Sequence, residues 1–375
     1  MNLERNSNIS AFMALLKAGL WEQEARLLPY GAIDYQEIYQ AAEEQTVVGI
    51  ITAGLEHVVD TNVPKNDLLT FIGRSLQLEQ TNKSMNGYIG SLIPAFQKRG
   101  LTPALVKGQG IAQCYERPLW RSSGDVDLII DKQEYSAAKT FFSKIASTND
   151  YEKKKHQKMM HSEFVHNDWV VELHGTLHAN LSTKMDAIID EIQDKMFQNG
   201  LFRKWENGTS TVLLPSSDDD VIFVFSHILQ HFFESGIGLR QICDLCRLLW
   251  VYRSEIDASL LRERLRKMGV ITEWKAFASL MVRHLGFPEG EMPLYEKSFD
   301  RKGDKILSLI LESGNFGRKL DYSYTKKYPP VIRKTITVAR QFGKTIDRAI
   351  VFPYDSIMFF LHFTKRGIVS ALNGD

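Results

Sequence analysis

The 375-residue sequence predicts an α+β protein, with a small α/β core built on a mixed sheet between two helical regions. Apolar positions recur at helical spacing through the first hundred residues and again after Pro215. Between these regions, short apolar runs alternate with helical segments and then form a hairpin pattern, as in a single α/β unit. We therefore expect an N-terminal helical region (1–99), a core (100–215) and a C-terminal helical region (216–375).

The expected elements of the first two regions follow from periodicity and from helix-stop and turn residues. Helical spacing covers 8–27, 35–59 and 66–99, and Arg99-Gly100 is a typical helix end. The core segments predict four strands, the last two joined by the turn residues Asn167 and Asp168. These strands are expected at 101–108, 125–131, 162–168 and 169–175, with helices at 110–117 and 133–147.

The C-terminal region begins with Ser216–Asp220, an acidic segment that is typical of a helix N-terminus. A helix should follow as far as Ser235-Gly236, and further amphipathic helices after it. From Arg301 onward, 14 Lys and Arg residues stand against six Asp and Glu, a net charge of +8. This basic C-terminal third indicates either an anionic partner or a solvated helical surface.

The overall composition is that of an ordinary globular chain, with 44% apolar and 24% charged residues and a net charge of +1. Three cysteines are too few for a disulfide framework and indicate a reducing compartment. Cys243 and Cys246 form a CxxC inside a helical pattern, so we expect buried thiols rather than a zinc or redox site. No signal-peptide pattern or membrane-length apolar run is found, so the expected location is cytoplasmic, without a membrane span.

Two aspartates, Asp125 and Asp127, occur one residue apart in the apolar strand sequence GDVDLII. Side chains alternate along a strand, so both carboxylates should lie on one face. Burying paired carboxylates is costly unless a cation neutralises them. Glu172 is a third acid in an apolar strand, WVVELHG. The three acids predict a divalent metal site, whereas solvated acids at a strand start are the alternative.

A second candidate feature is the strand-to-helix turn at Lys107–Gly110, in which Gly108 lies 17 residues before Asp125. Backbone N–H groups at such a turn can hold a phosphate, glycines at 108 and 110 allow close approach, and Lys107 can supply positive charge. An ordinary turn is the alternative. The chain lacks HExxH, GxSxG and Walker patterns, which argues against the common hydrolase and P-loop classes.

Together these residues resemble the DNA polymerase beta-like nucleotidyltransferase superfamily. The stretch VKGQGIAQCYERPLWRSSGDVDLII is similar to its bacterial uncharacterised nucleotidyltransferase family, and the resemblance continues at VVELHGTLH and covers about residues 95–250. It implies a nucleotidyltransferase core in which Asp125, Asp127 and Glu172 bind metal. It also implies that Lys107 and Gly108 contact phosphate. The serine usual at this turn is absent, and Ser122 or Ser123 is a possible substitute.

Several neighbouring side chains carry open alternatives. Arg121 either serves the site, by contacting phosphate or pairing with its carboxylates, or forms a structural ion pair, and Tyr115 is expected to pack. Of the histidines near the last two strands, His174 is the one expected to reach the site. Structural roles are favoured for His161, His166 and His178. The pair His227 and His231, near Arg240 and Asp244, indicates a buried polar network, an acceptor-pocket wall or, less favoured, a metal site.

The leading hypothesis is a nucleotidyltransferase that uses Mg²⁺, with Mn²⁺ as the alternative ion. It would move a nucleoside monophosphate from a nucleoside triphosphate such as ATP to a hydroxyl-bearing acceptor, releasing pyrophosphate. The acceptor could be a small molecule, a saccharide, a protein or RNA. The rival hypothesis is a non-catalytic binding or regulatory module that contacts an anionic partner through the basic C-terminal third.

Overall fold

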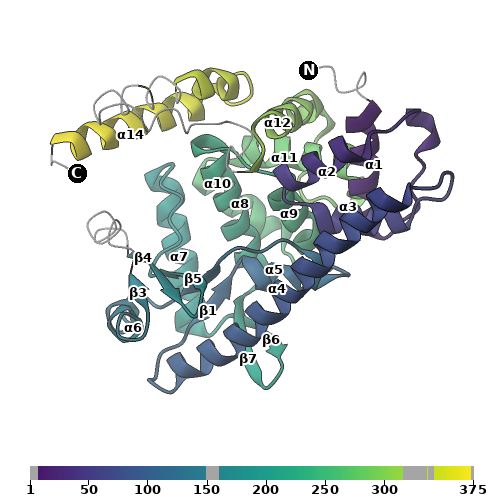
Figure 1. Cartoon of the computed structure of the whole chain (residues 1–375). Coiled ribbons are helices and arrows are strands. Elements are labelled where there is room, and N and C mark those ends of the chain that lie inside the picture. Colours follow the sequence, from purple (N-terminus) through teal and green to yellow (C-terminus); the bar gives the residue numbers. More distant parts are fainter. Residues whose placement is uncertain (1–6, 149–159, 316–335, 337–341, 373–375) are drawn as a thin grey trace.

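The computed structural model describes residues 7–148, 160–315, 336 and 342–372 of the chain. Its centre is a mixed seven-stranded sheet in the order β3-β4-β5-β2-β1-β7-β6 (Figure 1). Helices lie on both faces of this sheet and extend beyond it, which confirms the predicted α+β class. The strands are β1 Ala104–Val106, β2 Val126–Ile129, β3 Ser147–Thr148, β4 His161–His166, β5 Trp169–His174, β6 Phe202–Asn207 and β7 Ser210–Pro215.

Helices occupy the three segments predicted to be helical, with two differences in their bounds. The helix predicted at 8–27 ends at Trp21, because Glu22 takes a positive φ of 49°. The run predicted at 35–59 is two helices, because Thr46 takes a positive φ of 56° and interrupts it. The Asp34 side chain starts the first of these by accepting hydrogen bonds from two backbone N–H groups. The four helices are α1 Ser7–Trp21, α2 Tyr35–Glu44, α3 Val48–Glu56 and α4 Lys65–Gln97.

The core contains the four predicted strands and further elements that the periodicity analysis missed. Asn167 and Asp168 form the predicted turn, with φ values of 51° and 66° that suit a tight hairpin. The helix predicted at 110–117 is shorter, because it ends at Ala112 and a 3-10 turn follows at Pro118–Trp120. The core helices are α5 Gly108–Ala112 and α6 Tyr135–Phe142; missed were α7 Thr183–Asn199, β3 and the β6–β7 hairpin.

The two faces of the sheet have different neighbours. Leu105, Leu128 and Leu173 belong to an apolar cluster with residues of α4 and α6. The alternate residues Val106 and Ile129 belong to the larger cluster that contains the C-terminal helices. This alternation follows from the twofold repeat of a strand. Asp127 and Glu172 are also alternate residues and therefore lie on the face away from α4 and α6.

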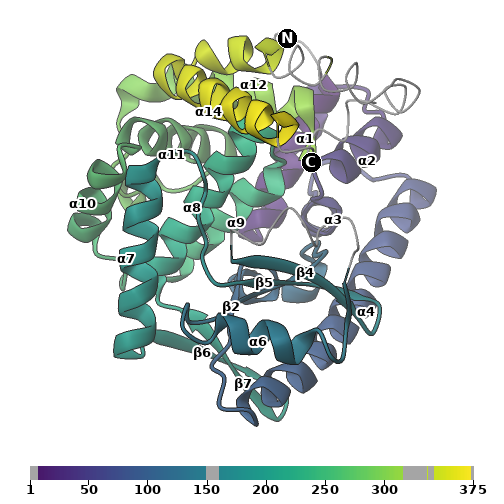
Figure 2. The same cartoon turned by 90° about the vertical axis from the view of Figure 1, so that its left-hand side faces the viewer.

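The C-terminal helices surround this second face and extend the core (Figures 1 and 2). Ser216 starts the first of them by accepting a hydrogen bond from the Asp219 N–H, and the acidic turn that follows suits the helix dipole. That helix ends before Ser235-Gly236, as predicted. The helices are α8 Ser217–Glu234, α9 Leu239–Val251, α10 Ala258–Met268, α11 Ile271–Leu285, α12 Asp300–Ser313 and α14 Pro353–Leu372.

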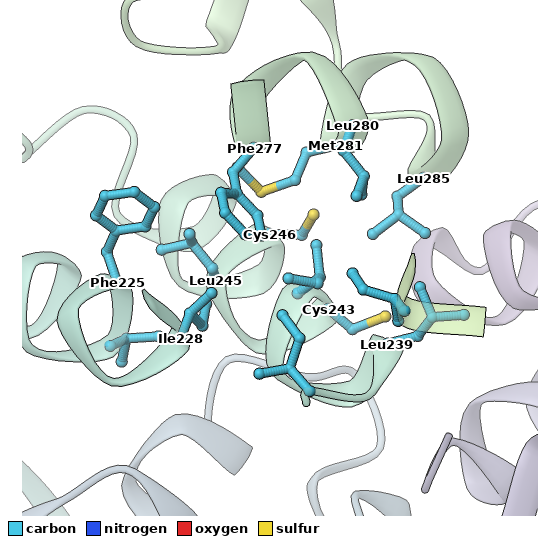
Figure 3. Packing of buried hydrophobic residues seen from close by; sticks show 14 of the residues in the cluster. Phe225, Ile228, Leu239, Cys243, Leu245, Cys246, Phe277, Leu280, Met281 and Leu285 are labelled. Carbon is cyan, nitrogen blue, oxygen red and sulfur yellow. The ribbon is translucent and has the colours of Figure 1, made fainter. Parts of the chain in front are cut away.

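Cys243 and Cys246 are buried in α9, where they pack among apolar side chains of α8 and α11 (Figure 3). Both are free thiols, and burial raises the pKa of each well above its ordinary value. A thiol whose ionised form is disfavoured is a poor metal ligand or nucleophile. The prediction that these cysteines are buried core residues is therefore confirmed.

Side chains of α4 pack on the sheet across the boundary expected at residue 99, and the three-part division stays a prediction. Of the 14 basic residues in the C-terminal third, seven lie in 316–335 and 337–341, outside the described residues, so half of the basic charge predicted to contact an anionic partner falls there. Across the described residues, no helix has both the length and the apolar character needed to cross a membrane.

Candidate active site

The candidate site is centred on the acids of β2 and β5. The two strands are parallel, and Asp127 is the register partner of Glu172, so their side chains are neighbours on one face of the sheet. Asp125 lies just before β2, two residues from Asp127. We call these three residues the carboxylate face. The sequence prediction that the DxD motif and Glu172 come together is consistent with this register, while their role as metal ligands stays a prediction.

Asp127 is the most enclosed member of the carboxylate face, with a side chain only 4% exposed. Its Oδ1 atom lies 2.8 Å from Lys107 Nζ and 3.0 Å from His174 Nε2. Burial would raise the pKa of Asp127, but these two groups outweigh it and lower the pKa below its ordinary value. Asp127 therefore stays ionised, as a cation ligand must.

Glu172 is more open, with a side chain 25% exposed, and two imidazoles converge on it. Its Oε2 atom lies 3.2 Å from His161 Nε2 and 3.3 Å from His174 Nε2. The two rings are stacked, with centroids 4.7 Å apart. Despite burial, hydrogen bonds from His161 and His174 lower the pKa of Glu172. Within the described part of the chain, these three side chains form the group whose ligand atoms lie within 4.8 Å of one another.

Asp125 differs electrostatically from its two partners. The negative charge of Asp127, followed by burial, raises the pKa of Asp125 to about 6. Lys107 opposes this shift, yet its positive charge is shared with the other two acids. Although burial disfavours its charged form, these acids raise the pKa of Lys107 and keep the ammonium protonated. For Asp125, the positive charges of Lys107 and Arg240 therefore do not offset the effects of Asp127 and burial.

The Lys107–Gly108 turn brings Lys107 to this face. Both residues have positive φ, 57° and 41°, and Lys107 is not a glycine, so the turn stores backbone strain. A Cβ on Gly108 would lie 3.5 Å from the Asp125 carbonyl oxygen, so this turn packs directly against the DxD segment. At Gly110 a Cβ would lie 2.9 Å from Cδ2 of Leu214, so α5 packs closely against the side chains of β7 here. Phosphate contacts of Lys107, Gly108 and Gly110 stay predictions.

Arg121 takes the second of its two predicted roles, a structural ion pair. Its Nε and Nη2 atoms donate to the two carboxylate oxygens of Asp244, at 2.8 and 2.7 Å. Tyr115 donates to the same carboxylate at 2.8 Å, so it does more than pack. Arg121 and Asp244 are both buried. We call Arg121, Asp244 and Tyr115 the arginine junction; it attaches the segment before β2 to α9.

Ser123 is also engaged by the protein. Its Oγ atom accepts hydrogen bonds from Arg121 Nη1 at 3.0 Å and from Gln109 Nε2 at 3.2 Å. The Ser122 carbonyl oxygen accepts one from Arg240 Nη1 at 2.7 Å. These contacts fix the loop that leads into Asp125. Phosphate binding by Ser123 or Arg121 stays a prediction, and it would require these existing hydrogen bonds to be shared.

His227 and His231 lie one turn apart on α8, with ring centroids 4.4 Å apart. His231 Nδ1 lies 3.2 Å from Ser235 Oγ. Burial, and then the positive charge of Lys107, lowers the pKa of both histidines, that of His231 to about 4. Both histidines are therefore neutral at pH 7, and both lie near enough to the carboxylate face for the charge of Lys107 to lower their pKa values. This arrangement fits the predicted buried polar network or pocket wall.

His161 is the main contributor that sequence reasoning missed, since a structural role was favoured for it. Its link to the site arises from the β4–β5 hairpin, in which His161 is the register partner of His174. The same register puts Glu163 opposite Glu172 and adds a fourth acid to this region. The strand pattern and the Asn167-Asp168 turn contained the signal, because a two-residue turn fixes the register. The expectation that His174 reaches the site is confirmed by its contacts with Asp127 and Glu172.

Comparison with protein-family models matches residues 31–286 to the family described as uncharacterised nucleotidyltransferase. The match includes β1, β2 and β5, and with them the three acids of the carboxylate face. It also extends beyond residues 95–250, the range of the sequence resemblance, into the N-terminal helices and α11. Searches of curated proteins and of solved structures found no match. The family model spans more than half of the chain, and the chain therefore belongs to the uncharacterised nucleotidyltransferase family.

Proposed function

We propose that the protein transfers a nucleoside monophosphate from a nucleoside triphosphate to a hydroxyl-bearing acceptor, with a divalent cation, Mg²⁺ or Mn²⁺, as cofactor. Membership of a nucleotidyltransferase family supports the general activity. The observation that carries the metal dependence is the pairing of Asp127 with Glu172 on adjacent strands, beside an Asp125 whose pKa is raised to about 6 by Asp127 and burial.

The carboxylate face fits a divalent cation on two grounds. Its donor atoms are carboxylate oxygens, the ligands that Mg²⁺ prefers, and they come from one short strand segment and its neighbour. The raised pKa of Asp125 also marks an acid that lacks sufficient positive charge nearby. Asp125, Asp127 and Glu172 would hold the ion. When bound, such a cation supplies charge neutralisation at the reacting phosphate.

The residues of the chain would orient the reactants. Lys107, already 2.8 Å from Asp127, provides a fixed positive charge at the edge where the triphosphate would lie. In the transfer, the acceptor oxygen forms a bond to the α-phosphorus while the bond to the pyrophosphate oxygen breaks. The hydroxyl proton passes to a carboxylate of the face or to solvent. Catalysis of this kind depends mainly on positioning and charge.

The acceptor site would lie on the side of α8. His227 and His231 on α8 would line it, because burial keeps both neutral and the charge of Lys107 reaches them. Neutral imidazoles can bind hydroxyl groups as hydrogen-bond donors or acceptors. A small molecule, a saccharide, a protein side chain or RNA could supply that hydroxyl.

The direct test is to incubate the protein with each α-labelled nucleoside triphosphate, with and without Mg²⁺ or Mn²⁺, and to follow both nucleotide binding and pyrophosphate release. Wild type should bind at least one triphosphate in a cation-dependent manner. The Asp125→Ala/Asp127→Ala variant should lose this dependence. If neither protein binds any triphosphate at millimolar concentration, the proposal is wrong.

One observation favours a second candidate, the non-catalytic module. Lys107 and His174 already contact Asp127, so this acid has cationic partners within the chain itself. In that case triphosphate or partner binding, measured by calorimetry, should be the same with and without Mg²⁺ and should persist in the double variant. A cation-dependent difference between the two proteins would instead support the transferase.

A further inference from the structure

Two histidines lie beside the carboxylate face, and the metal site proposed above, with its three carboxylate ligands, does not use them as ligands. His161 begins β4 and His174 ends β5, and the antiparallel register makes them direct neighbours. Glu172 precedes His174 by two residues and lies on the same face. The side chains of His161 and Glu172 are 22% and 25% exposed, so a small ion can reach them from solvent.

The separations of the two histidine nitrogens from Glu172 match those around a bound transition-metal ion, and all three ligand atoms lie within 4.8 Å of one another. Metal–nitrogen bonds of about 2.0–2.1 Å and metal–oxygen bonds of about 2.0–2.2 Å put neighbouring ligand atoms about 3.0 Å apart at a right angle and about 3.4 Å apart at a tetrahedral angle. Both histidine Nε2 atoms lie in this range from Glu172 Oε2, at 3.2 and 3.3 Å. His174 Nε2 also lies 3.0 Å from Asp127 Oδ1, so an oxygen of a second acid adjoins the group.

We propose that His161, Glu172 and His174 form a nitrogen-containing subsite for a first-row transition-metal ion of the Zn²⁺ or Co²⁺ class. Imidazole nitrogen favours such ions, whereas the all-oxygen arrangement of Asp125 and Asp127 suits Mg²⁺. The subsite rests on the proposed function only in sharing Glu172. It would supply a second, chemically distinct cation beside the first, with Glu172 between them.

A simpler arrangement would have the imidazoles only hold Glu172 in place by hydrogen bonds. One imidazole donor is enough to orient a carboxylate, yet here two aim at the same oxygen with their rings stacked 4.7 Å apart. Two stacked rings that were both protonated would repel each other. Two convergent nitrogens and one carboxylate oxygen, open to solvent, are instead the donor set that transition-metal sites use.

The test is titration of the purified full-length protein with Co²⁺, followed by visible absorption, and with Zn²⁺ by calorimetry in the presence of excess Mg²⁺. Wild type should give the absorption of nitrogen-ligated Co²⁺, which Zn²⁺ but not Mg²⁺ displaces. His161→Gln should weaken Zn²⁺ binding by at least about tenfold, since one of three ligands is lost.

The matched control is His166→Gln, on the same strand. His166 Nδ1 lies 2.9 Å from the Tyr88 hydroxyl, and an odd separation from His161 puts it on the other face of the sheet. Zn²⁺ affinity should be unchanged in this control. Thermal unfolding of both variants checks that they fold. The wild-type Co²⁺ spectrum tests nitrogen ligation independently of either variant.

Three outcomes separate this inference from the proposed function. A wild-type protein whose bound Co²⁺ shows no nitrogen ligation, or a His161→Gln variant with unchanged Zn²⁺ affinity, would overturn the histidine subsite, and hydrogen bonding alone would then explain the imidazoles. Cation-dependent triphosphate binding could still persist, so the proposed function would stand. Conversely, a nitrogen-ligated Co²⁺ site in a protein that binds no triphosphate would support the subsite and contradict the transferase.

Discussion

The carboxylate face and the arginine junction both bury charged groups, and they lie at the two ends of the short segment from Arg121 to Asp127. In the arginine junction the charges are matched, because the Arg121 guanidinium donates two hydrogen bonds to the Asp244 carboxylate. The Tyr115 hydroxyl donates a further hydrogen bond to the same carboxylate. On the carboxylate face, Asp127 raises the pKa of Asp125 to about 6, and the acids share Lys107 and the histidines.

This difference separates a structural role from a functional one. A matched buried pair depends on both partners, because the loss of one leaves an uncompensated charge. An acid with insufficient counter-charge lowers stability, so its presence indicates a ligand that is absent from the protein alone. Substitutions of Asp125 and of Asp244 should therefore have opposite effects on the stability of the metal-free protein.

The largest expected effect is on activity at the carboxylate face. Asp127→Asn should reduce cation-dependent nucleotidyl transfer by about 10³-fold, because a charge that acts on the transition state is lost. Pyrophosphate release measures this. Asp131→Asn is the control, since that carboxylate accepts a hydrogen bond from the Gln133 N–H beyond the end of β2. Equal activity in Asp127→Asn and wild type would contradict the metal role.

At the arginine junction the main effect should be on stability. Asp244→Asn should lower the free energy of unfolding by about 3 kcal/mol, because buried Arg121 loses its counter-charge. Denaturant unfolding measures this difference. Asp304→Asn, which breaks a much more exposed pair with Arg283, should cost less than about 1 kcal/mol. Similar losses in the two variants would remove the contrast on which the comparison depends.

At Asp125 of the carboxylate face, by contrast, the loss of the acid should not destabilise the metal-free protein. The pKa of Asp125 is raised to about 6, so the native state holds its proton longer than the unfolded chain, and stability falls as pH rises through 6. Asp125→Asn removes this penalty and should raise the free energy of unfolding at pH 7.5 by up to about 1 kcal/mol.

Measuring unfolding of the wild type and Asp125→Asn at a lower pH, and again with added metal, makes this test more specific. The gain from Asp125→Asn should shrink at pH 5, where the wild-type carboxyl is largely protonated. Mg²⁺ should stabilise the wild type more than the variant, because only a ligand bound to the native state shifts unfolding. A variant that is less stable than wild type at pH 7.5 without metal would mean that Asp125 is structural.

The smallest effect concerns Ser123, which joins the two clusters. Because its hydroxyl already accepts hydrogen bonds from Arg121 and Gln109, Ser123→Ala should cost about 1 kcal/mol of stability. The KM for the triphosphate should change by less than about twofold. A tenfold rise in KM with unchanged stability would instead support the predicted phosphate contact of Ser123.

The sequence predicted the carboxylate face because its signal is local. Acids inside apolar strands are conspicuous, and strand alternation is enough to put Asp125 and Asp127 on one face. The turn at Asn167-Asp168 was equally local. The short α5 and the two helices within 35–59 were less accurately predicted, since periodicity does not fix where a helix stops.

The remaining features depend on contacts between distant parts of the chain. Arg121 and Asp244 are 123 residues apart, so nothing near Arg121 indicated which of its two roles it would take. His161 becomes a neighbour of Glu172 only through the hairpin register. The missed helix α7 did carry a local signal, with Ser182 capping its start and Gly200 ending it in the left-handed conformation.

The most direct test of the central claim is a crystal structure of the protein soaked with Mn²⁺ and a non-hydrolysable triphosphate, read by the anomalous signal of the metal. We expect a peak within coordination distance of Asp125, Asp127 and Glu172, with triphosphate oxygens completing its ligands. A bound triphosphate with no anomalous peak at the carboxylate face, or a peak only elsewhere in the protein, would contradict the account.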